Sequence, residues 1–79
     1  MIEAEPLRNF IRKEFLFDSS AELGDNQPLI PDIIDSLGVM ELVEFVEETY
    51  GVKVHEDDLL VDNFETVSAI TAFVEHLRG

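Results

Sequence analysis

The chain has 79 residues, 46% of them hydrophobic, and this length predicts one small domain with a single core. It contains no cysteine, which excludes a disulfide and a cysteine-based metal site. Its 18 acidic and 5 basic residues give a net charge of −13, so nucleic acid and anionic membrane surfaces are unfavourable partners.

This charge is unevenly distributed along the chain. Residues 1–17 hold three acidic and three basic side chains, so the whole −13 lies after residue 17. Such a concentration indicates a partner with a basic docking surface, because long-range attraction would speed encounter. The N-terminal residues lack the basic and apolar regions of a signal peptide, and no apolar run reaches the ~18 residues of a membrane span. We therefore expect a cytoplasmic location.

The first patterned segment predicts an amphipathic helix over residues 5–17. Apolar residues recur there at three- and four-residue spacing, and Pro6 fits a first-turn position. The side chains expected to face the core are Leu7, Phe10, Ile11 and Phe15. The basic side chains expected on the solvated side are Arg8, Arg12 and Lys13.

Residues 18–34 show no sustained hydrophobic period and contain Gly24, Pro28 and Pro31. A connection of this length is unusual in a small domain. It nevertheless carries several apolar residues, namely Leu23, Leu29, Ile30, Ile33 and Ile34. These predict a loop that packs onto the helices rather than a free linker.

The strongest pattern predicts a helix from Ser36 to about Tyr50, closed by Gly51. Asp35 and Ser36 are both favourable N-cap residues, and an anion attached to Ser36 would be stabilised by the helix N-terminus. One broad apolar face is expected to be buried: Val39, Leu42, Val43, Phe45, Val46 and Tyr50. The opposite face carries Glu41, Glu44, Glu47 and Glu48, with Leu37 and Met40 among them. Apolar residues surrounded by charge indicate a docking surface, although scattered surface hydrophobes are also normal.

The C-terminal part predicts two more helices. An acidic start that suits the helix dipole indicates a short third helix over residues 56–61. A fourth helix is expected over residues 65–78, with Val67, Ile70, Phe73, Val74 and Leu77 facing inward. The predicted fold is an all-α small four-helix bundle with three longer helices, one short helix and a long first loop.

Independent catalysis is not expected. A hydrolase would need Ser36 to meet His55 or His76, and both histidines lie near expected helix ends, where they are more often capping or solvated residues. No nucleophile elbow, metalloprotease motif or phosphate-binding glycine loop is present. The acidic cluster over residues 57–65 lacks EF-hand spacing, so we predict no metal site, with incidental divalent binding left open.

The segment Asp35-Ser36-Leu37 at the start of the second helix resembles the acyl carrier protein family. The resemblance continues through residues 41–44, 46–52, 56–59 and 63–67, and so covers nearly the whole chain in order and spacing. It implies that Ser36 is esterified by 4′-phosphopantetheine, whose thiol carries acyl or aminoacyl groups as thioesters. It also implies that Asp35 and Leu37 flank the cofactor, with Asp35 as cap and transferase contact, and that the protein is a carrier rather than an enzyme.

The same resemblance assigns partner recognition to a docking face of Leu37, Met40, Glu41, Glu44, Glu47 and Glu48. The implied partners are a phosphopantetheinyl transferase, an acyl- or aminoacyl-adenylating ligase, and acyl-processing enzymes with basic docking surfaces. Residues 33–39 and 47–54 look most like freestanding carriers of specialised pathways. Neither end carries a linker, so we expect a separate polypeptide with a single carrier domain over residues 1–79. We also expect a monomer.

Three points stay open from the sequence. The chain could instead be an unmodified acidic interaction module with the same fold. Gly38 is either tolerated in the first turn or allows close approach to the prosthetic arm, since glycine in a helix costs roughly 0.5–1 kcal/mol relative to alanine. An acyl chain could lie between the second and third helices, where we expect Phe45 to fill the space already.

Overall fold

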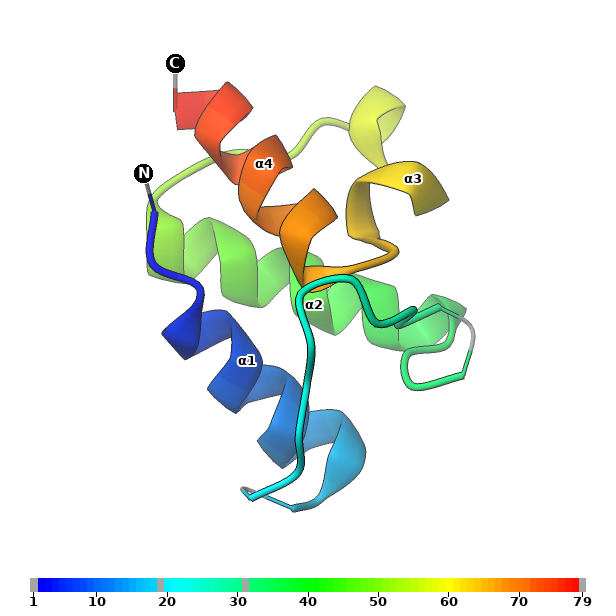
Figure 1. Cartoon of the computed structure of the whole chain (residues 1–79). Helices are drawn as coiled ribbons and strands as arrows, with labels where there is room; N and C mark the ends of the chain where they lie inside the picture. The colour runs from blue at the N-terminus through cyan, green and yellow to red at the C-terminus, as the bar shows by residue number, and fades with distance from the viewer. Residues whose placement is uncertain (1, 19, 31, 79) are drawn as a thin grey trace.

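The computed structural model describes residues 2–18, 20–30 and 32–78, apart from the side chain of Ser36. Three longer helical segments and one short helix pack around one core (Figure 1). They are α1 (Glu5–Ile11) with its π-helical extension (Arg12–Leu16), α2 (Ser36–Tyr50), α3 (Val61–Phe64) and α4 (Val67–Arg78). A 3-10 turn (Glu56–Asp58) precedes α3. The described residues contain no strand, and the predicted all-α bundle with a long first loop is confirmed.

The first helix spans the predicted residues but changes its geometry part-way. The α-helix ends at Ile11, and residues Arg12–Leu16 continue as a π-helix, a wider turn that is rare and often found at functional sites. Phe17 then takes a left-handed conformation with φ 54°, and its N–H donates to the Arg12 carbonyl oxygen. Apolar spacing did not reveal this change, because Phe15 and Leu16 are the only apolar residues of the extension and two neighbouring residues define no period.

The core takes side chains from every helix and from the loop. Its buried members are Leu7, Ile11, Leu23, Leu29, Ile34, Leu42, Val43, Val46, Phe64, Val67, Ile70, Phe73 and Val74. The inward faces predicted for the first, second and fourth helices are confirmed, with Phe10, Phe15, Val39, Phe45, Tyr50 and Leu77 packed at the edge and only partly buried. No polar side chain is buried among the described residues.

The long loop is fastened to the helices by hydrogen bonds and ion pairs. The Leu29 N–H donates to the Glu65 carbonyl oxygen over 2.7 Å, and the Ser68 N–H donates to the Asp25 carbonyl oxygen over 2.9 Å. Figure 1 shows the loop running from the end of α1 towards the start of α4 before it reaches α2. The prediction of a packed loop is therefore confirmed.

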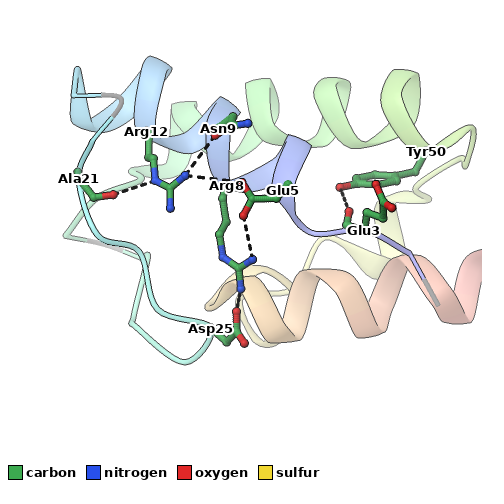
Figure 2. A network of polar contacts seen from close by, with 8 residues as sticks. All are labelled: Glu3, Glu5, Arg8, Asn9, Arg12, Ala21, Asp25 and Tyr50. Atoms are coloured by element: carbon green, nitrogen blue, oxygen red, sulfur yellow. Dashed lines mark hydrogen bonds and ion pairs between the residues drawn. The ribbon is translucent and has the colours of Figure 1, made fainter.

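Two basic residues of α1 and its extension hold this loop instead of facing solvent. Arg8 forms an ion pair with Asp25, and the Arg12 Nε donates to the Ala21 carbonyl oxygen over 2.8 Å (Figure 2). Their side chains are only 20% and 19% exposed, so the predicted solvated position is wrong for both and right for Lys13. The neutral N-terminal segment thus uses two of its three basic side chains to hold the loop.

The predicted third helix over residues 56–61 is wrong in position. The chain makes a 3-10 turn over Glu56–Asp58, extends at Leu60, and forms α3 only at Val61–Phe64. Phe64 decides this, since its buried ring packs edge-on against Phe73 of α4, with centroids 5.5 Å apart. The fourth helix, α4, begins at Val67, two residues later than predicted. Thr66 directly precedes it, and its Oγ1 accepts a hydrogen bond from the Ala69 N–H.

Candidate cofactor attachment site

The start of α2 has the geometry of a capped helix. Asp35 is extended (φ −87°, ψ −178°), and its Oδ1 accepts from the Gly38 N–H over 2.7 Å. Its carbonyl oxygen accepts from the Val39 N–H over 3.0 Å, which begins the helical ladder. Ser36 is therefore the first residue of a 15-residue helix, and Asp35 is the predicted cap. The exposure expected for the Ser36 side chain lies outside the described atoms.

Gly38 is buried where the first helix packs on the first turn of α2. A Cβ at this position would lie 2.7 Å from Phe15 Cε1 and 3.1 Å from Ile34 Cγ2. Real Cβ atoms do not approach other atoms so closely, so the space is taken by a ring of the protein itself. Gly38 thus lets the π-helical segment pack directly on the first turn of α2. No sequence signal links Phe15 to Gly38.

The predicted docking face is largely exposed. Leu37 and Met40 are 80% and 53% exposed, and Glu41, Glu44 and Glu48 are exposed beside them. Glu47 differs, because it is half-buried and its Oε2 accepts from the Val54 N–H over 2.8 Å. This glutamate ties the extended segment after α2 back to the helix. Sequence analysis grouped Glu47 with the exposed glutamates, because nothing in the pattern of the helix shows its bond to Val54 in the following segment.

An apolar groove opens between α2 and α3 beside the capping aspartate. Its volume is about 540 Å³, and Asp35 lies at its edge. The apolar lining comes from Ile30, Val39, Met40, Leu59, Leu60, Val61 and Phe64. The expectation that Phe45 fills this space is wrong, because its ring stacks on Phe10 of α1 with centroids 4.2 Å apart. The sequence did not identify residues 59–61 as part of a groove wall, because its pattern assigned them to the expected third helix.

The histidines lie apart from this region. His55 precedes the 3-10 turn and His76 lies in the last turn of α4, and both are exposed. Across residues 2–18, 20–30 and 32–78, no three His, Asp or Glu side chains gather closely enough to hold a metal ion. None of the helices within those ranges is long and apolar enough to cross a membrane.

Comparison with known proteins decides the family. The model of the phosphopantetheine attachment site family matches residues 19–74. The chain belongs to this family. It is 30% identical over 80 residues to a probable acyl carrier protein, PigG, of Serratia sp. (strain ATCC 39006), across 100% of this chain and 91% of that protein. It is also similar to a chain in the crystal structure of an FAD-dependent dehydrogenase, with 32% identity and a TM-score of 0.76, over 86% of this chain and 97% of that one.

Membership defines the type of protein and its cofactor. The chain is a carrier protein rather than an enzyme, and 4′-phosphopantetheine is attached covalently to a serine. It therefore interacts with a phosphopantetheinyl transferase and with biosynthetic enzymes that act on the carried group. The start of α2 could accommodate such a group, because the N-terminus of a long helix favours an attached anion. The cofactor supplies the thiol that forms the thioester.

Proposed function

We propose that Ser36 is the serine that accepts 4′-phosphopantetheine. The family match also contains Ser19, Ser20 and Ser68. Ser36 alone follows a capping aspartate at the start of a long helix, where the phosphate charge would be stabilised. The Ser20 hydroxyl instead donates to Asp18, and Ser68 lies within α4. The observation that carries this proposal is that Ser36 directly follows the capping residue Asp35 as the first residue of α2.

In this proposal the chain's own residues orient the attachment turn. Asp35 fixes the first turn through its bond to the Gly38 N–H, so the backbone around Ser36 is preorganised before the transferase arrives. Leu37 follows as an exposed apolar contact beside the arm. The domain spans residues 1–79 and functions in the cytoplasm as a monomeric carrier in fatty acid or secondary metabolite biosynthesis.

The carried group is an acyl or aminoacyl thioester, and the apolar groove supports an acyl group with an apolar chain. Burial of each methylene from water contributes about 0.8 kcal/mol, so even a short chain would favour this groove. The groove is lined both by Asp35, next to the attachment residue, and by the buried Phe64 of the core. NMR spectra of holo protein loaded with acyl groups of increasing length test this, because Leu60 and Val61 methyl shifts should change with chain length.

The docking face meets partners with basic surfaces in this proposal. Leu37, Met40, Glu41, Glu44 and Glu48 supply apolar contact and negative charge, while Glu47 contributes mainly by holding Val54. The partners are an adenylating ligase that loads the arm and enzymes that process the loaded group. The likeness to a chain in the crystal structure of an FAD-dependent dehydrogenase supports including such dehydrogenases in a partner screen.

Intact-mass spectrometry tests the proposed attachment directly. The apo chain is incubated with coenzyme A and a broad-specificity phosphopantetheinyl transferase, beside Ser36→Ala and Ser20→Ala. We expect a single phosphopantetheinyl adduct on the wild type and on Ser20→Ala, and none on Ser36→Ala. No adduct on the folded wild type, with a control carrier modified in parallel, would instead support the unmodified interaction module.

A further inference from the structure

The aromatic ring of Phe17 has no role in the fold. It is 85% exposed, more than any other large hydrophobic side chain among the described residues. Its φ of 54° lies in the left-handed region, which is unfavourable for a bulky residue and is better suited to glycine or asparagine. Neither packing nor backbone preference therefore accounts for phenylalanine at this position, and an interaction outside the chain would.

The position of Phe17 is nevertheless well defined relative to the attachment turn. The π-helical turn ends at this residue, with the Phe17 and Asp18 N–H groups both donating to the Arg12 carbonyl oxygen. Phe15, two residues earlier, packs into the space left by Gly38 in the first turn of α2. The end of the first helix is thus locked against the start of α2, and Phe17 is presented beside it.

A second groove lies between these two elements. Its volume is about 460 Å³, and the exposed side chains of Phe17 and Leu37 both line it. Carboxylates of Glu14, Asp32 and Glu41 line it as well, and none of its described lining residues is basic. A groove lined by both exposed apolar side chains and carboxylates is complementary to an apolar side chain flanked by lysine or arginine.

We propose that this groove receives the phosphopantetheinyl transferase, which inserts an apolar side chain between Phe17 and Leu37 and places basic side chains near Glu14, Asp32 and Glu41. The proposal rests on attachment at Ser36. Both neighbours of that residue, Asp35 and Leu37, line the groove. An enzyme that reaches the serine hydroxyl must cover this turn, whereas enzymes that act at the far end of a flexible arm need not.

The first test removes the ring without straining the backbone. Phe17→Asn suits the left-handed conformation, so its melting temperature should equal or exceed that of the wild type. With a broad-specificity transferase and saturating coenzyme A, we expect KM for the apo chain to rise at least about fivefold with little change in kcat. The control is Ala72→Asn, which replaces an exposed apolar side chain on α4, outside the lining of both grooves, and should leave KM unchanged.

The outcomes separate this proposal from the proposed function. If the KM of Phe17→Asn is unchanged while the wild type is fully modified, the proposed docking of the transferase in this groove is wrong. The carrier function would then remain intact. An equal rise for Ala72→Asn would also overturn it, because the effect would then not be specific to the groove beside the attachment turn. A wild type that accepts no arm would remove both proposals together.

The second test concerns the carboxylates that line this groove. Glu14→Gln and Asp32→Asn should each raise KM at low ionic strength, and the difference should vanish near about 0.5 M salt, where surface charges are screened. Asp57→Asn removes the same charge from the exposed 3-10 turn and is the control. An equal effect of Asp57→Asn would show that only the overall charge attracts the transferase, which would contradict a specific role for these carboxylates.

Discussion

Phe15 and Gly38 meet where the first helix ends and α2 begins, with Phe15 Cε1 only 2.7 Å from the position that a Gly38 Cβ would occupy. The contact joins the π-helical segment to the first turn of the helix that carries the attachment residue. Glycine at this position therefore lets Phe15 pack directly on the attachment turn, where a side chain would force that ring to shift.

We predict that Gly38→Ala lowers the free energy of unfolding by about 1–2 kcal/mol, because overpacking outweighs the gain in helix propensity. Urea denaturation followed by circular dichroism measures the change. Gly24→Ala is the matched control, since a Cβ there meets nothing within 4 Å. The double variant Gly38→Ala with Phe15→Leu should recover part of the loss. Equal stabilities of Gly38→Ala and wild type would contradict the close contact.

We predict that Arg8→Gln loosens the long loop more than it affects the helices. Arg8 pairs with both Glu5 and Asp25 (Figure 2). The Asp25 carbonyl oxygen in turn accepts from the Ser68 N–H. Loss of the guanidinium should lower the free energy of unfolding by about 1 kcal/mol, the scale of a partly exposed ion pair. Hydrogen exchange should accelerate at the Ser68 amide in Arg8→Gln.

Lys13→Gln is the control for charge alone, because Lys13 is exposed on the same helical segment. It should leave exchange at Ser68 unchanged. Equal acceleration in both variants would mean that positive charge in general, and not the Arg8–Asp25 pair, holds the loop.

The parts of the fold that sequence reasoning found are those determined by neighbouring residues. Asp35 and Gly51 act on backbone groups within three or four positions, so both ends of α2 could be predicted from residue type. The inward faces of α2 and α4 follow from a period that a helix imposes on its whole length. The attachment turn could be located for the same reason.

The parts that it missed depend on contacts between distant segments. Glu47 binds the Val54 N–H, Arg8 binds Asp25, and Phe15 packs on Gly38, and no local pattern marks any of these pairs. The short third helix was displaced because buried Phe64, not the preceding acidic run, determines where the chain turns into the core. An apolar space between the second and third helices was expected from the sequence, but its lining and the second groove depend on such contacts and could not be predicted.

We predict that Glu47→Ala lowers the free energy of unfolding by about 1 kcal/mol, while Glu44→Ala leaves it nearly unchanged. The Glu47 carboxylate accepts from the Val54 N–H over 2.8 Å, whereas Glu44 is exposed. Thermal denaturation measures both variants. Binding of a partner with a basic surface should weaken for Glu44→Ala despite its intact stability. Equal stability losses would contradict the separate roles of these two glutamates.

The only tyrosine of the chain gives a direct readout at alkaline pH. Partial burial raises the pKa of Tyr50 above its ordinary value of 10.0, and its hydroxyl donates to the Glu3 carbonyl oxygen over 2.7 Å. Because the unfolded state then loses the phenolic proton first, stability from this group is complete below pH 10.0 and is lost as pH rises through the raised pKa.

Phenolate absorbance of the folded protein should show a midpoint above 10.0, and urea should return it to the ordinary value. Lysine side chains titrate in the same pH range, so the pH dependence of stability is also measured for Tyr50→Phe. The difference between wild type and Tyr50→Phe is then the contribution of the tyrosine. A folded midpoint at or below 10.0 would show that the Tyr50 side chain is not held against the N-terminal segment.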